Sequence, residues 1–258
     1  MSDLNTNLVS NKKSDNMNPL GRPLTIVFAL PGKEYSNKFL LSWTMLFNYC
    51  ISHQINPLIT NHYDKNCYYV RNNCIGGNNI KGKDQKPFGG EIDYDFIMWI
   101  DPDKVFTVDN FIDLLKHDKD IVSGIYLMNS RAFNTIEKFD NDYFREHGNY
   151  KFLTCEELMK RSEKESEKES NVESVLEVDY TGMGWMLVKK GVFERLEYPW
   201  FRPEWSKFEM TDASGNKSEI LEFSNEDVSF MNAVKKQNIV IHVDTKVLVG
   251  HETELVMG

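Results

Sequence analysis

The 258-residue chain has no run of apolar residues that reaches the roughly 18 needed to span a membrane. Its N-terminal stretch, MSDLNTNLVSNKKSDNMN, lacks the apolar segment of a signal peptide. The four cysteines form no C-x-x-C pair and no zinc-ribbon spacing, so we expect reduced thiols and no structural zinc site. These absences predict a soluble protein of the cytoplasm, or of the host cytoplasm if the chain is viral.

Positive charge is also scarce, because 30 Lys and Arg residues stand against 39 Asp and Glu residues and give a formal net charge of −9. Such a chain has no general basic field, which disfavours non-specific binding to duplex nucleic acid. A local basic groove stays possible, since Lys81, Lys83 and Lys86 lie close together in one segment. Hydrophobic residues make up 41% of the chain, a composition typical of a globular domain.

Apolar patterns of strand and helix length alternate along the first half of the chain. Strands are predicted at residues 24–30, 57–63, 92–100 and 120–126. Between the first two, Ser36 can cap a helix whose apolar residues recur at helical spacing. This alternation predicts a single α/β domain, in which helices flank a mixed, mainly parallel central sheet.

Two segments are expected to lie outside the packed part of the domain. Residues 1–22 are rich in Asn, Ser, Lys and Asp and predict a disordered tail ahead of a domain at 23–258. The charged, low-complexity run at 160–177 predicts an insertion, which is either a solvated helix or disordered. We assign no chemical role to this run.

Two aspartates end the most apolar strand after the first, where FIMWI runs into Asp101, a proline and Asp103. Ligands of open α/β sheets bind at the carboxyl ends of the strands. Two carboxylates at such a place offer hard oxygen donors to Mg²⁺ or Mn²⁺. The alternative is a simple Asp-Pro turn, because Asp side chains readily bond to their own backbone.

Further acid and imidazole groups occur near the C-terminus. His251 follows an apolar strand. An imidazole beside two carboxylates suits Mn²⁺ better than Mg²⁺. The alternative is a surface residue, which is the more frequent role of a lone His. Glu226 and Asp227 open a predicted helix. One of them can act as a general base, or both can simply favour the helix dipole behind Ser224 as N-cap.

Two weaker signals come from glycine and arginine. Gly182 and Gly184 flank Met183 ahead of an apolar strand, which indicates either the close approach of a ligand or a bulge. Arg71 stands among aromatic residues and is followed by Asn72. An arginine there can bind a phosphate through two parallel hydrogen bonds, or lie on the surface.

The order of these motifs over residues 24–252 resembles that of the GT-A glycosyltransferases, and among them the family-2-like enzymes, which include small soluble bacterial and bacteriophage members. In that pattern a first strand ends near a proline and an Arg-Asn pair follows the second strand. An Asp-x-Asp strand end, a GMG-type segment, a Glu-Asp helix start and a late Val-Gly-His come next. The matching segments are Pro31, Arg71-Asn72, WIDPD, TGMGWMLV, NEDVSF and VGH.

The resemblance implies a metal-dependent enzyme that transfers a sugar from a nucleotide-diphosphate donor, most often a UDP-sugar, to an acceptor hydroxyl. Asp103 and His251 would hold the Mn²⁺ or Mg²⁺ ion, with Asp101 on the ion's water or on the ribose. Asp227 would deprotonate the acceptor, and Glu226 would orient the sugar or the acceptor. Donor contacts are implied for Pro31, Asp64, Arg71, Asn72, Asp101, Gly182, Met183 and Gly184, with Asp64 on the base edge.

The acceptor is the least defined part of this expectation. Trp185, Trp200, Phe201 and Trp205 are candidates for stacking on a sugar or base, with core packing as the alternative. The acceptor itself can be a saccharide, a protein, a small molecule or a hydroxymethylated base in viral DNA. Two other functions compete: a binding module for nucleotides or carbohydrates without turnover, and a sugar-nucleotide pyrophosphorylase. The latter requires a glycine-rich basic loop, and ALPGKEYS has one glycine and one lysine.

Overall fold

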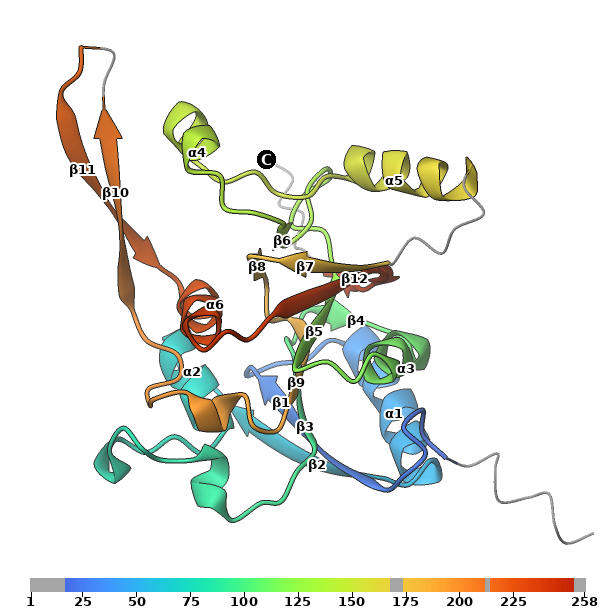
Figure 1. Ribbon diagram of the computed structural model, residues 1–258. Coiled ribbons are helices and arrows are strands. Elements are labelled where there is room, and N and C mark those ends of the chain that lie inside the picture. The colour runs from blue at the N-terminus through green and yellow to red at the C-terminus, as the bar shows by residue number, and fades with distance from the viewer. Residues whose placement is uncertain (1–16, 168–173, 212–213, 253–258) are drawn as a thin grey trace, which may run out of the picture.

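The computed structural model describes residues 17–167, 174–211 and 214–252 (Figure 1). They form a mixed α/β single domain around a seven-stranded sheet with the strand order β2-β1-β3-β9-β5-β12-β7. The bounds of these strands are β1 Leu24–Pro31, β2 Ile55–His62, β3 Phe96–Ile100, β5 Ile121–Ile125, β7 Val175–Val178, β9 Trp185–Lys189 and β12 Ile241–Leu248.

Helices and three small sheets surround this central sheet. The helices are α1 Asn37–Ser52, α2 Cys67–Cys74, α3 Val108–Lys116, α4 Asn141–His147, α5 Cys155–Glu167 and α6 Glu226–Lys236. The small sheets pair β10 Glu204–Thr211 with β11 Lys217–Ser224, β4 Lys104–Val105 with β13 Gly250–His251, and β6 Thr135–Ile136 with β8 Tyr180–Thr181. Short 3₁₀ turns lie at Asn79–Lys81, Pro87–Gly90 and Phe193–Arg195.

The central sheet is mixed, and its pairings divide evenly among the described strands. β1 is parallel to β2 and β3, and β5 is parallel to β12. β9 is antiparallel to both of its neighbours, β3 and β5, and β7 is antiparallel to β12. The expectation of a mainly parallel sheet is therefore met only in part. Because β9 is antiparallel to β3, it begins beside the carboxyl end of β3.

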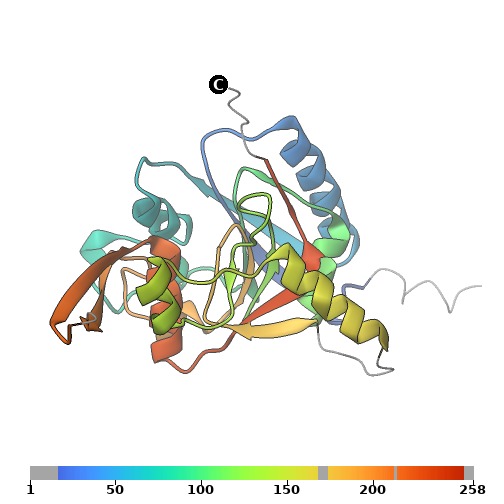
Figure 2. The same cartoon turned by 90° about the horizontal axis from the view of Figure 1, so that it is seen from above.

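Both faces of the sheet are buried, as the apolar strands predict. Along β1, Ile26 and Phe28 belong to one core cluster, whereas Val27 and Ala29 belong to the other. The first cluster includes buried side chains of α1 and α3, and the second includes those of α6. In Figures 1 and 2 the helices α1 and α3 accordingly lie on the opposite side of the sheet from α6.

Local signals predict the elements of the first half well. Ser36 is the N-cap of α1, and its side-chain oxygen accepts a hydrogen bond of 3.0 Å from the backbone N–H of Phe39. The strand expected at 92–100 is shorter and begins at Phe96. The segment at 74–90, which carries Lys81, Lys83 and Lys86, contains the end of α2 and two 3₁₀ turns.

The segments expected to lie outside the packed domain are described only in part. Residues 1–16 of the expected tail and 168–173 of the expected insertion fall outside the described residues. Asn18 is 3% exposed, and its side-chain amide donates to the backbone carbonyls of Arg22 and His53. The ordered domain thus begins ahead of residue 23. In the parts of the chain that the structure describes, no helix combines the length and the apolar character of a membrane span.

Candidate functional site

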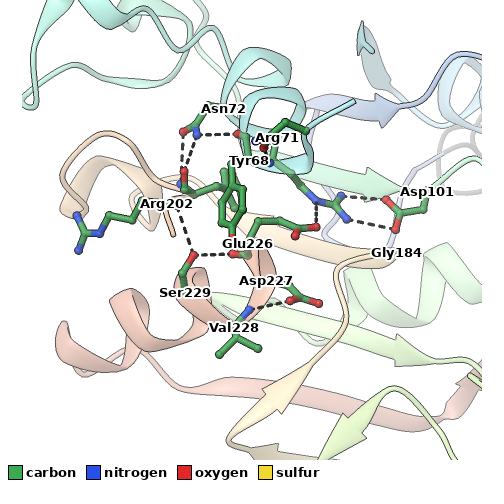
Figure 3. Close-up of polar contacts among 12 residues, drawn as sticks. Tyr68, Arg71, Asn72, Asp101, Gly184, Arg202, Glu226, Asp227, Val228 and Ser229 are labelled. Atoms are coloured by element: carbon green, nitrogen blue, oxygen red, sulfur yellow. Dashed lines mark hydrogen bonds and ion pairs between the residues drawn. The ribbon is translucent and has the colours of Figure 1, made fainter. Parts of the chain in front are cut away.

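The candidate site lies where β1 and β3 end and α6 begins (Figure 3). Asp101 directly follows β3, and Arg71 reaches it from the last turn of α2. Arg71 Nη1 donates to Asp101 Oδ1 at 2.9 Å, and Nη2 donates to Oδ2 at 3.2 Å. This is the parallel two-bond geometry in which arginine binds a carboxylate most specifically.

Arg71 also connects Asp101 to the acid pair at the start of α6. Its Nε lies 3.7 Å from Glu226 Oε1, and its guanidinium carbon lies 5.3 Å from the centre of the Trp99 ring. The side chain of Arg71 is only 8% exposed. Burial by itself lowers the pKa of Arg71, but the nearby carboxylates, Asp101 first among them, raise it overall. Arg71 therefore places a permanent positive charge between two carboxylates.

Asp227 is held by two hydrogen bonds. The hydroxyl of Tyr180 donates to Oδ2 at 2.7 Å, and the backbone N–H of Val228 donates to Oδ1 at 2.8 Å. Burial raises the pKa of Asp227 above its ordinary value, although the bond from Tyr180 acts in the opposite direction. Burial likewise raises the pKa of Glu226, against the lowering effect of Arg71. The N-cap of α6 is Asn225, so the expectation of Ser224 as N-cap is wrong.

We expect Asp227→Asn to increase the free energy of unfolding at neutral pH relative to wild type. The folded-state pKa is raised, so ionisation of Asp227 disfavours the native state above that pKa, and the effect vanishes below the ordinary pKa of an aspartate. The asparagine amide can keep both contacts, because a tyrosine hydroxyl also accepts hydrogen bonds. Urea unfolding at several pH values would show a gap that closes as the pH falls.

The matched control is Asp84→Asn, whose side chain is 84% exposed. We expect the control to follow wild type at every pH. A gap between Asp227→Asn and wild type that stayed constant, or widened, on acidification would contradict the argument from burial.

His251 reaches the site because β13 pairs with β4, with Lys104 opposite His251 in the register. Nε2 of His251 lies 3.0 Å from Asp103 Oδ2, and Nδ1 lies 2.7 Å from the backbone carbonyl oxygen of Leu127. Both ring nitrogens thus face oxygen acceptors, whereas a neutral imidazole has a single N–H. One ring nitrogen can therefore donate to one of these oxygens, and a cation shared by His251 and Asp103 would satisfy the other contact.

Asp103 and His251 provide a carboxylate and an imidazole, two groups that bind divalent cations. Imidazole ligands usually direct their other nitrogen to a carbonyl or a carboxylate, as His251 does toward Leu127. Asp101 does not complete the set, because both of its oxygens bond to Arg71. Among the described residues, no group of three or more His, Cys, Asp and Glu side chains is arranged to hold a metal ion. Asp103 and His251 are thus the two expected ligands that lie together among the described residues, whereas Asp101 bonds to Arg71.

A buried lysine beside Asp103 is a feature that the sequence analysis missed. Lys104 is 2% exposed, and its Nζ lies 2.5 Å from Asp103 Oδ1 and 4.0 Å from the centre of the Tyr126 ring. The ammonium is therefore a second fixed positive charge in the site. A signal was present in the sequence, since Lys104 alternates with Phe106 at the spacing of inward-facing strand residues.

The glycine segment packs against these groups. The backbone N–H of Asp101 donates to Gly184 O at 3.0 Å, and a Cβ on Gly184 would lie 2.5 Å from Lys104 Cε. A Cβ on Gly182 would collide with the hydroxyl of Tyr126. Glycine is required at both positions by the protein's own side chains. Met183 is 1% exposed in the core, so the donor contact expected for it is not available.

The other expected donor residues have mixed outcomes. The turn after Pro31 touches the Asp-Pro-Asp segment, since a Cβ on Gly32 would lie 3.0 Å from Pro102. Asn72 is 4% exposed, and its side chain bonds to the backbone N–H and carbonyl of Phe201, which makes it a structural residue. Asp64 is exposed and accepts a hydrogen bond from the backbone N–H of Asn66, next to it in the loop after β2.

The aromatic residues expected to stack on an acceptor are mostly in the core. Trp185 is 0% exposed, and Trp200 and Phe201 are each 1% exposed, so their rings offer no face to a ligand. Core packing, the alternative left open by the sequence, describes these three. Trp205 differs, because it lies on the β10–β11 hairpin and is 64% exposed. Tyr180, the partner of Asp227, was not among the predicted residues.

Comparison with known proteins adds little. No family model matches the sequence, and no curated protein matches it. Among solved structures, A197 from STIV is similar in backbone, with a TM-score of 0.49 and 16% sequence identity, over 90% of this chain and 86% of that one. Similarity at this level carries no information on function.

Proposed function

We propose that the protein is a glycosyltransferase of the GT-A type, which moves a sugar from a nucleoside-diphosphate donor, UDP-sugar first among the candidates, to an acceptor hydroxyl. The observation that carries this proposal is the contact of Arg71 with both Asp101, at the end of β3, and Glu226, at the start of α6 beside Asp227 (Figure 3). The Asp103–His251 pair lies two residues beyond Asp101 in the chain. A Rossmann-like GT-A sheet is part of the proposal, and the shared direction of β1, β2, β3, β5 and β12 supports it.

On the donor side, Asp103 and His251 would hold Mn²⁺ or Mg²⁺. When bound, such an ion acts as a Lewis acid that stabilises negative charge on a leaving diphosphate. Lys104 and Arg71 add two fixed positive charges, both largely removed from water and therefore little screened. Both cations are paired with Asp103 and Asp101, so the metal ion would supply the uncompensated positive charge that a negatively charged donor group needs here.

On the acceptor side, Asp227 would act as the general base of an inverting transfer. The acceptor oxygen forms a bond to the anomeric carbon as the bond from that carbon to the diphosphate oxygen breaks. The hydroxyl proton passes to Asp227, and the electron pair leaves with the diphosphate. A carboxylate whose pKa is raised by burial is a stronger base than an exposed one. Tyr180 fixes its orientation.

One observation favours the alternative of a binding module without turnover: Arg71 occupies both oxygens of Asp101, so this carboxylate is not free to bind a metal ion. The raised pKa of Asp227 favours the transferase instead, because a protein that only binds a nucleotide or a carbohydrate would not need such a base. Measured turnover separates the two functions.

We expect the wild-type protein to release nucleoside diphosphate from at least one nucleotide sugar in the presence of Mn²⁺. Chelation of the metal should abolish the release, and Asp103→Ala should lower it by roughly 10²-fold or more, the usual cost of losing a group that stabilises developing charge. The measurement is donor hydrolysis across a panel of nucleotide sugars, together with a thermal shift for each nucleotide.

The control is Asp84→Ala, which removes an exposed carboxylate and should leave hydrolysis unchanged. Absence of release with every donor, combined with a thermal shift from a nucleotide, would favour the binding module. Full activity of Asp103→Ala would remove Asp103 from the donor site.

A further inference from the structure

The β10–β11 hairpin projects from the domain (Figure 1). A groove lies beside this hairpin. It encloses about 920 Å³ between the hairpin, α4 and the start of α6, and we call it the hairpin groove. Its walls come from segments far apart in the sequence. A volume of this size accommodates several sugar rings or nucleotides.

The hairpin groove adjoins the candidate base. Tyr180 lines it, and the hydroxyl of the same residue donates to Asp227 at 2.7 Å. Asn225 and Val228, which stand on either side of the acid pair, line it as well. On the donor side, the hydroxyl of Tyr68 donates to the backbone carbonyl of Ser224, at the end of β11. Asp227 itself does not line the groove, so a ligand there approaches it through these neighbours, Tyr180 above all.

The hairpin wall of the groove is aromatic. Trp205 and Phe223 are directly opposite each other in the β10–β11 register, with ring centres 5.5 Å apart, and they are 64% and 48% exposed. On the opposite wall the rings of Phe144 and Tyr150 lie 4.9 Å apart. Phe144 and Tyr150 are half-buried, so the exposed aromatic surface belongs to the hairpin wall, and such surface beside a groove is typical of a ligand-binding site.

The positive charges of the groove are already compensated by nearby carboxylates. Its three lysines each lie near a carboxylate, in the pairs Lys207–Glu219 at 3.6 Å, Lys235–Asp179 at 3.0 Å and Lys236–Glu204 at 3.7 Å. A nucleic acid gains affinity mainly by pairing its phosphates with Lys and Arg. The groove offers little positive charge for this purpose, so its chemistry favours an uncharged ligand.

We propose that the hairpin groove is the acceptor site and that the acceptor is a neutral saccharide chain. Apolar C–H faces of its sugar rings would stack on Trp205 and Phe223, and a hydroxyl of the terminal ring would reach Asp227. The proposal rests on the proposed glycosyltransferase function. It favours a saccharide over a modified base in DNA, for which a phosphate backbone would have to follow the same groove.

The test compares direct binding of two kinds of probe to the full chain. Neutral hexasaccharides of glucose, mannose and N-acetylglucosamine are titrated calorimetrically against wild type, and so is a single-stranded oligodeoxynucleotide. We expect at least one hexasaccharide to bind, and Trp205→Ala to weaken that binding roughly tenfold or more, as for other exposed aromatic anchors. Leu221→Ala is the matched control, because Leu221 is 52% exposed on the same hairpin but does not line the groove.

Hexasaccharide binding that is lost in Trp205→Ala and kept in Leu221→Ala supports the proposal. Binding that Trp205→Ala leaves intact, tighter binding of the oligonucleotide, or failure of all three hexasaccharides at millimolar concentration overturns it. Donor hydrolysis is measured separately on wild type and on Leu221→Ala, which should retain it because Leu221 does not line the groove. Saccharide binding through Trp205 by a wild-type protein that hydrolyses no donor would overturn the transferase function, and with it the acceptor role.

Discussion

Replacing Asp227 with Asn is expected to slow sugar transfer by roughly 10²- to 10⁴-fold, the usual contribution of a general base. The amide keeps the shape of the side chain and its contacts to Tyr180 and Val228, but it cannot accept the acceptor proton. Donor binding does not involve this group, so the nucleotide-induced thermal shift should be unchanged. The measurement is the rate of transfer with saturating donor and acceptor, beside the thermal shift.

Under the proposed function, the pH dependence of transfer by the wild-type protein provides a second readout of the role of Asp227. Activity should fall as the pH is lowered through the raised pKa of Asp227, above the range in which an ordinary aspartate titrates. Asp84→Asn serves again as the control and should retain both the rate and the pH profile. Transfer by Asp227→Asn at the wild-type rate would show that another group takes the proton.

Local sequence signals predict the elements that position these groups. Ser36 caps α1, the FIMWI segment forms β3 with every residue buried, and the Glu-Asp pair opens α6. Each of these outcomes depends on residues a few positions apart, so a short pattern contains the necessary information. The convergence of strand ends also follows, because parallel strands joined by helices end at the same edge of a sheet.

The pairing of charges in the site is different, because it depends on contacts between distant segments. Nothing in the sequence around Asp101 indicates that Arg71, 30 positions earlier, takes both of its oxygens. The burial of Lys104 likewise depends on Tyr126 and on the glycines that leave room for it. The exposure of Trp205, in contrast to Trp185 and Trp200, is decided by the projection of the hairpin from the domain.

These non-local contacts place Arg71 at the centre of the site. Its guanidinium faces Asp101 and Glu226, whose side chains are 22% and 16% exposed, so neither carboxylate is well solvated. Removing one partner of a buried ion pair leaves the other charge buried and uncompensated. The resulting loss of stability is usually larger than the stability that the intact pair contributes. The stability of the structure around Asp101 and around Glu226 is therefore expected to depend on Arg71.

Arg71→Met is expected to lower the free energy of unfolding by about 3 kcal/mol, the lower end of the range for breaking a buried pair, since both carboxylates retain some contact with water. Arg71→Lys should recover part of this loss, because it restores the charge but not the two parallel hydrogen bonds. Urea unfolding at neutral pH measures both variants. The matched control is Arg195→Met, whose side chain is 45% exposed and paired with Asp120, and its cost should stay below about 1 kcal/mol.

A double variant tests whether the cost arises from the uncompensated carboxylate. In Arg71→Met combined with Asp101→Asn, the charge that the arginine balanced is gone, so the double variant should be more stable than the sum of the two single effects predicts. The loss of stability that remains in the double variant is attributed to Glu226, which still lacks the positive charge of Arg71. Strictly additive effects would mean that Arg71 stabilises the fold through its packing on Trp99, 5.3 Å from the guanidinium, and not through its charge.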